Sequence, residues 1–240
     1  MRTPLLYKVY WTLRRGWKRL TPEARYAVRS FVASQKTAHG YMNAGGHEDA
    51  YYGQFGRLLE AVFTPIKVLR LSRRPLVVQE SMGRDTVYGY FFAFIEQEMK
   101  FRRKRSEFRD NSFFTLLASS FASLTTNAVC CILAMQHQMG KQPNAAYVKW
   151  LQQRQDETGG FYANEDAPVP DVLSTAVALF TLRLIGAEVK DATQFIQAHW
   201  LGIGGFEPTL YDDYSDVEYV FYGLLALGAT VDRKQLTLKY

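Results

Sequence analysis

A helical unit repeated about every 45 residues constrains the fold of this chain more than any other feature of the sequence. The clearest copy, residues 150–186, contains a polar-faced helix, a Gly159-Gly160-Phe161 turn, a proline-rich loop and an apolar helix led by Asp171. The next copy places Gly204-Gly205-Phe206 and Asp216 each 45 residues later. A fixed period of this length is typical of stacked supersecondary units, none of which can bury its apolar face alone.

Weaker copies of the unit extend toward the N-terminus, where the apolar helices are led by Asp49, Asp85 and Thr125. An Asp or Thr at this position can accept hydrogen bonds from the free N–H groups of the first helical turn. Glycines mark the expected helix ends; they are Gly140, Gly186 and Gly228. The helices between these apolar ones are basic on one side. The pattern predicts one all-α domain over residues 1–240, an α/α toroid of about five helical hairpins with inner and outer layers, closed or incomplete.

Residues 1–20 form an amphipathic segment in which Leu, Tyr and Trp alternate with Arg and Lys. It could lie on an anionic membrane, or it could be a first helix that packs on the body. The net charge of +6 favours an anionic partner such as a membrane surface or a diphosphate, and no nucleic acid is expected. The adjacent Cys130 and Cys131 favour a reducing, cytoplasmic compartment, with peripheral membrane attachment as an option. The uncharged stretch 111–140 reads as two buried helices, with a membrane span as the alternative.

The segment RQDETGGFYANEDAPVPDVLSTAVALFTL, repeated as WLGIGGFEPTLYDDYSDVEYVFYGLLAL, resembles the prenyltransferase/squalene-cyclase repeat. This repeat defines the α/α-toroid superfamily of protein prenyltransferase β subunits and terpenoid cyclases, and the resemblance is good over residues 145–229. It implies an isoprenoid ligand in a central cavity and, for a short chain, a partner subunit. The zinc-binding His of the prenyltransferases would lie three residues after the leading Asp, where this chain has Tyr52, Tyr88, Ser174 and Tyr219. Zinc is therefore not expected.

Aromatic residues recur at the start of the apolar helices. Tyr52, Tyr88 and Tyr219 each follow a leading Asp by three residues, so they share its helix face. In a toroid these positions face one cavity, and with Tyr51 and Phe91 they would form an aromatic wall for an isoprenoid chain. Aromatic ring faces can also stabilise a carbocation. Filling of the ring centre as ordinary core is the alternative interpretation.

Acidic residues supply two catalytic hypotheses. Asp212, Asp213 and Asp216 spell DDxxD, a spacing at which carboxylates could hold Mg²⁺ and ionise an allylic diphosphate. A cavity acid, either Asp171, Asp216 or Asp49, could instead protonate the substrate. The leading expectation is a prenyltransferase- or terpenoid-cyclase-like protein that binds a polyprenyl diphosphate. The alternative is a non-catalytic toroid that docks a membrane or partner protein through its basic surface.

Overall fold

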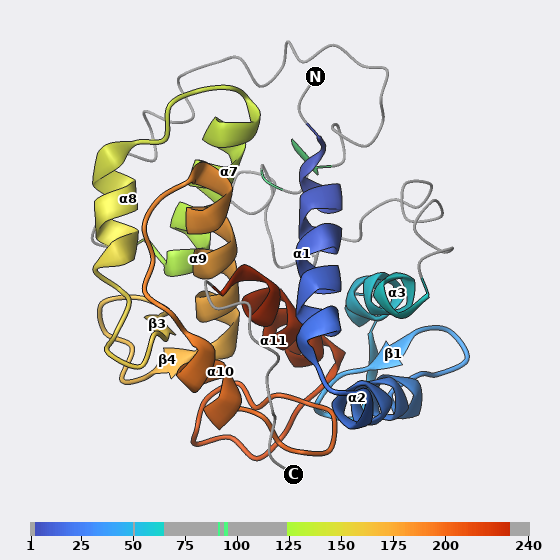
Figure 1. Cartoon of the computed structure of the whole chain (residues 1–240). Coiled ribbons are helices and arrows are strands. Elements are labelled where there is room, and N and C mark those ends of the chain that lie inside the picture. The colour runs from blue at the N-terminus through green and yellow to red at the C-terminus, as the bar shows by residue number, and fades with distance from the viewer. Residues whose placement is uncertain (1–2, 50, 65–90, 92–93, 96–123, 231–240) are drawn as a thin grey trace.

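The structure, a computed structural model, describes residues 3–49, 51–64, 91, 94–95 and 124–230 (Figure 1). These residues are mostly helical, which confirms the all-α class. The helices among them are α1 (Leu5–Arg19), α2 (Pro22–Ser34), α3 (Tyr52–Phe63), α7 (Thr126–Gln138), α8 (Ala145–Gln152), α9 (Val172–Ile185), α10 (Thr193–Ala198) and α11 (Val217–Ala229). Two short antiparallel pairs are formed by β1 (Tyr41–Met42) with β2 (Glu48–Asp49) and by β3 (Phe161–Tyr162) with β4 (Pro170–Asp171).

The Gly-Gly-Phe turns have the same local structure in both clear copies of the repeat. Gly159 and Gly204 adopt positive φ angles of 94° and 104°, which L-residues with side chains rarely adopt. A Cβ added to Gly159 would lie 2.2 Å from the Asp191 carbonyl oxygen, and one added to Gly204 would lie 2.3 Å from the Ala27 carbonyl oxygen. The glycines are therefore required both by the turn and by its close approach to the neighbouring backbone.

The aromatic residue of each turn is buried and forms a backbone bridge to the end of the preceding outer segment. The bridges join Gln155 to Phe161 and Trp200 to Phe206, and Lys36 is joined to Tyr41 in the same way. The weaker third copy, which has Gly40-Tyr41 in place of Gly-Gly-Phe, thus uses the same device. The period seen in the sequence is matched by a repeated local structure.

The predicted helix caps are largely confirmed. Asp171 accepts a hydrogen bond from the N–H of Ser174 at 2.7 Å, Asp216 caps α11, and Thr125 caps α7. Gly186 and Gly140 adopt the expected left-handed conformation with φ angles of 76° and 79°. These residues act through local chemistry, so the sequence alone is enough to place them.

The expected role of Gly228 as a helix end is wrong. The helix α11 continues to Ala229 and is capped by Thr230 in an extended conformation. A Cβ on Gly228 would lie 1.8 Å from the carbonyl oxygen of Thr12. Gly228 is therefore glycine because α1 packs against α11 at this point.

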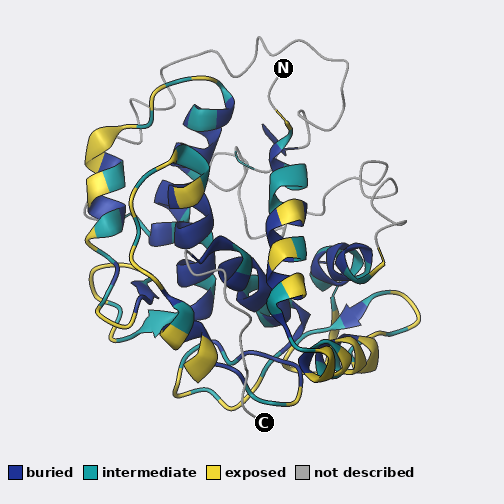
Figure 2. Cartoon of the chain, viewed as in Figure 1, coloured by how far each residue is buried: buried dark blue, intermediate teal, exposed yellow. Residues whose placement is uncertain are grey.

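The apolar helices lie next to one another in the order α7, α9, α11, α3, so that the last of them in sequence contacts the first. Figure 2 shows α9 and α11 mostly buried, whereas exposed residues are concentrated on α8, on α2 and on one side of α1. This separates an inner set of helices from the outer helices α2, α8 and α10.

Helix α1 lies across the C-terminal ends of inner helices. Its Trp17 ring packs on Phe63, the last residue of α3, with ring centroids 4.5 Å apart. A Cβ added to Gly16 would lie 2.0 Å from the Leu224 carbonyl oxygen of α11, so the two helices approach closely. Lys8 donates to the side chain of Gln138, the last residue of α7, at 2.5 Å.

The basic residues of α1 satisfy free carbonyl groups at these helix ends. Arg15 and Arg19 donate to Gly228 and Leu227 of α11 at 3.2 and 2.6 Å, and Arg14 donates to Val62 of α3. Cations are stabilised at helix C-termini by the helix dipole and the unpaired carbonyls. Leu5, Leu13 and Trp17 of α1 are buried against the body, as one of the two interpretations expected, and peripheral attachment to a membrane stays a prediction.

The uncharged stretch 111–140 is described only from residue 124 onward, where α7 is a helix of 13 residues with a buried majority. In the part of the chain that the structure describes, no helix combines the length and the apolar character needed to span a membrane.

Candidate functional site

The N-terminal ends of α3 and α11 meet at the opposite end of these helices from α1. Tyr52, the first residue of α3, lies close enough to Glu218 in the first turn of α11 for each side chain to shift the pKa of the other. The C-terminal ends of the same two helices both contact α1. The helices α3 and α11 therefore run in the same direction, with their leading residues gathered at one end.

Aromatic rings from α3 and α11 pack together just inside this end. Phe55 contacts Phe221 with ring centroids 5.0 Å apart and Tyr222 at 5.8 Å. Tyr51 packs edge-on against Phe55 at 5.1 Å, and Tyr52 packs edge-on against Tyr51 at 5.9 Å. Such edge-to-face contacts stabilise aromatic clusters beyond the area that they bury. We call these five residues the aromatic cluster.

The aromatic cluster is not wholly enclosed by the described residues. Tyr51, Phe55 and Phe221 are buried, but Tyr52 and Tyr222 are only partly buried. Burial nevertheless raises the pKa of Tyr222 well above its ordinary value. Its hydroxyl therefore lies in a poorly solvated environment although part of the side chain remains accessible.

Side chains from α7 and α9 lie near the same rings. Cys131 of α7 contributes to the raised pKa of Tyr222, and Asp171 at the start of α9 contributes to the raised pKa of Tyr219. Tyr219 in turn contributes to the raised pKa of Tyr52. Groups from the four inner helices that the structure describes are thus close enough to influence one another electrostatically.

Glu218 has the most unusual ionisation of the carboxyl groups in this region. Burial raises its pKa from 4.5 to about 7, and the negative charges of Asp216 and Asp49 add to the increase, while the hydrogen bond with Tyr52 opposes it. A carboxyl group with this pKa exchanges its proton near neutral pH, which suits general acid–base chemistry.

Asp216 lies beside Glu218 and is fully buried, with a relative exposure of 1%. One oxygen, Oδ1, accepts from the N–H groups of Glu218 and Tyr219 at 2.9 and 3.2 Å. The other oxygen, Oδ2, is buried without a well-formed hydrogen bond. Burial raises the pKa of this carboxyl, while the N–H groups of Tyr219 and Glu218 and, to a smaller extent, the Ala44 backbone and the Tyr52 side chain lower it.

The other two predicted acids lie at the same end of the helices. Asp171 caps α9, and burial raises its pKa against the opposing effect of the Ser174 hydrogen bonds. Asp49 accepts from the Tyr51 N–H at 2.7 Å and is not the N-cap of α3, because that helix begins at Tyr52. Asp49 remains close enough to Glu218 and Tyr51 to influence the pKa of each.

The predicted magnesium ligands have separate structural roles. Asp212 accepts from the backbone and hydroxyl of Thr209 at 3.0 and 2.7 Å, Asp213 is exposed, and Asp216 is a buried cap. No group of three His, Cys, Asp or Glu residues suited to a metal ion occurs among the described residues. The magnesium site remains a prediction.

Of the predicted aromatic residues Tyr88 and Phe91, the structure describes only Phe91. Tyr88 lies outside the described residues, and Phe91 is partly buried and packs against the same core as Tyr52 and Tyr219.

Sequence reasoning missed Glu218 and Tyr222. Their spacing of four residues puts them on one helix face, but an acid in a first turn reads as a partner of the helix dipole.

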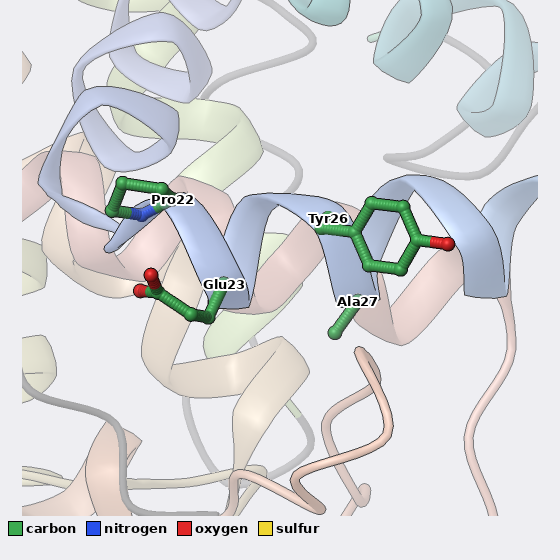
Figure 3. A pocket seen from close by; sticks show the side chains of 4 residues that line it. All are labelled: Pro22, Glu23, Tyr26 and Ala27. Atoms are coloured by element: carbon green, nitrogen blue, oxygen red, sulfur yellow. The ribbon is translucent and has the colours of Figure 1, made fainter.

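A hollow on the outside of the molecule is unrelated to these residues. Figure 3 shows it along α2, where it is lined by Pro22, Glu23, Tyr26 and Ala27. None of the predicted site residues lines it, and Tyr26 is 75% exposed.

Comparisons of the chain with protein-family models, with curated proteins and with solved structures found no match. The case for any function therefore depends on the residues and geometry described above.

Proposed function

We propose that the chain is an α/α toroid that binds an isoprenoid between its inner helices and acts on it as a prenyltransferase- or terpenoid-cyclase-like enzyme. The observation that carries the proposal is the aromatic cluster with its adjoining carboxyl groups, Asp216 and Glu218. An apolar ligand chain would contact the rings, and the carboxyl groups would transfer protons at its reactive end.

The order of the inner helices supports the toroid. A closed ring requires the last inner helix to pack beside the first, and α11 contacts α3. A closed ring also requires its inner helices to be parallel. This agrees with α3 and α11, whose N-terminal ends lie together and whose C-terminal ends both contact α1. Helix α1, bound across the C-terminal ends through Arg14, Arg15 and Arg19, would close one end of the ring and leave the acidic end as the entrance.

The chemistry of the aromatic cluster supports an isoprenoid ligand. Isoprenoid chains are apolar and react through positively charged intermediates, which ring faces stabilise in a poorly solvated site. The raised pKa values of Tyr51, Tyr52 and Tyr222 all have burial as their largest cause, so water is scarce around these hydroxyls. Exclusion of water would also protect a carbocation from premature capture.

The docking alternative receives less support from the described residues. Several basic side chains of α1 bind carbonyl groups of the protein itself, so they contribute less to an external basic surface. The basic stretch 100–110 lies outside the described residues.

Incubation with farnesyl and geranylgeranyl diphosphates, with Mg²⁺ or with EDTA, tests the proposal through retained ligand and released diphosphate. Tyr219→Ala should weaken retention about tenfold, whereas Tyr26→Ala, a matched change at an exposed tyrosine, should leave it unchanged. Retention without turnover would indicate a binding module. No retention of these ligands or of farnesol above that of an unrelated protein would refute the proposal.

A further inference from the structure

Positive charge is concentrated at the N-terminal end of the chain. Residues 1–20 contain six Lys or Arg residues and no Asp or Glu, and the whole chain has a formal net charge of +6. The rest of the chain is therefore balanced, and the excess lies in α1 and just before it. Helix α2 adds Arg25 and Arg29 against a single acid, Glu23. An anionic partner would be drawn to this part of the molecule from a distance.

Hydrogen bonds fix the positions of several of these cations without removing their charge. Arg14 donates to the carbonyl oxygen of Val62. Arg25 donates to the carbonyl oxygens of Trp17 and Lys18 at 3.0 and 2.6 Å. A carbonyl oxygen carries no net charge. The guanidinium groups are therefore less available for direct contact with a partner, but they still contribute to a positive potential over α1.

One face of α1 is exposed and combines an aromatic ring with two cations. Trp11, Arg15 and Lys18 are spaced so that they share a helix face, and all three are exposed. Figure 2 shows exposed residues along one side of this helix. The Trp11 ring is 56% exposed and packs edge-on against the buried Tyr10, with ring centroids 5.1 Å apart. We call Trp11, Arg15 and Lys18 the exposed α1 face.

We propose that the exposed α1 face binds the surface of an anionic phospholipid membrane. Tryptophan is enriched at the boundary between membrane and water, where both its apolar ring and its N–H group are accommodated. The neighbouring cations would be attracted to anionic head groups. A nucleic-acid duplex would be attracted by the same charges but offers little apolar surface for the ring.

This mode of contact differs from the insertion of an amphipathic helix. An inserted helix buries its apolar side in the membrane. The apolar side of α1 already packs on the protein, with Leu13 and Trp17 buried there. The membrane would instead meet the opposite side of the helix, so binding should depend on surface charge and on Trp11. The inference is independent of the proposed isoprenoid-binding function.

Co-sedimentation of the full-length protein with vesicles tests this inference. Vesicles that contain phosphatidylserine should bind the protein at least about tenfold more tightly than vesicles of phosphatidylcholine alone, and added salt should weaken the binding. Trp11→Ala and Lys18→Gln should each weaken it about fivefold. The matched controls are Tyr211→Ala and Lys149→Gln, which remove an exposed ring and an exposed charge from other surfaces and should have no effect.

Tryptophan fluorescence locates the contact on the protein. Trp11 is 56% exposed, whereas the other three tryptophans, Trp17, Trp150 and Trp200, are at most 8% exposed. Vesicles with phosphatidylserine should therefore shift the emission to shorter wavelength, and the shift should be absent in Trp11→Ala. Vesicle binding without this shift, equal binding of the two kinds of vesicle, or binding of duplex DNA but not of vesicles would overturn the inference and leave isoprenoid binding untouched.

Discussion

Tyr52 and Glu218 lie far apart in the sequence but close enough in the fold for each side chain to shift the pKa of the other. Each stands at the start of an inner helix, α3 or α11, so this contact joins the first described inner helix to the last. It also places a phenol and an acid of raised pKa beside the aromatic cluster.

The stability of the protein should depend on pH through Glu218. The folded protein holds this proton up to about pH 7, whereas the unfolded chain releases it near the ordinary value of 4.5. The stability linked to this group is thus fully present below pH 4.5 and is lost as the pH rises to about 7. From this source the loss should be about 3 kcal/mol.

Urea unfolding of wild type and Glu218→Gln at pH 5 and pH 8 measures this dependence. The glutamine variant cannot titrate at this position, so it should gain stability relative to wild type as the pH rises. If the two proteins differ in free energy of unfolding by the same amount at both pH values, the pKa of Glu218 is not raised in the folded protein.

Substitution of Gly16 should disrupt the contact between α1 and α11. A Cβ at this position would overlap the Leu224 carbonyl oxygen, a backbone atom that cannot rotate away. Gly16→Ala should lower the free energy of unfolding by about 3 kcal/mol, measured by urea denaturation. Gly40→Ala is the matched control, because its nearest neighbour would be 3.8 Å from the new Cβ. A Gly16→Ala protein as stable as this control would mean that the two helices do not pack as described.

Two substitutions of Asp171 distinguish a structural role of this residue from a catalytic one. Asparagine caps helices about as well as aspartate, so Asp171→Asn should change stability by only a few tenths of a kcal/mol, whereas Asp171→Ala should cost about 1 kcal/mol. If the carboxyl group also transfers a proton to the ligand, Asp171→Asn will keep its stability but lose activity, whereas Asp171→Ala will lose both. Thermal unfolding together with turnover of an isoprenoid substrate measures both effects, and full activity in Asp171→Asn would leave this residue as a cap alone.

The two cysteines should be unreactive in the folded protein. Burial raises the pKa of the Cys130 thiol to about 12 and that of Cys131 well above its ordinary value. Because the thiolate is the nucleophile, alkylation by iodoacetamide at pH 8 should be at least about a hundredfold slower than in urea-unfolded protein. Mass spectrometry of timed samples follows the modification. Rapid alkylation of the native protein would contradict the burial of α7.

Much of the local structure could be predicted from the sequence because it depends on nearby residues. The N-caps Asp171 and Thr125 and the left-handed Gly186 act within a few positions of themselves. The Gly-Gly-Phe turns were visible as a repeat for the same reason. The helical class and several helix boundaries followed from these signals.

Features that depend on distant contacts could not be predicted in this way. Gly228 resembles a helix end locally, and only the approach of Thr12 explains why it is glycine. Glu218 reads as a first-turn acid of α11, and its raised pKa depends on burial and on Asp49 near α3. The closed toroid and its ligand remain proposals because the sequence indicates helices and caps but not how the ring closes.

Photoaffinity labelling tests the central claim most directly. A farnesol analogue bearing a benzophenone at the apolar end would be cross-linked to the full-length protein, and the labelled peptides would be mapped by mass spectrometry. Our account predicts saturable labelling of the segments that contain residues 51–55 and 218–222, reduced by excess farnesol. Labelling confined to other parts of the surface, or labelling that excess farnesol does not reduce, would contradict it.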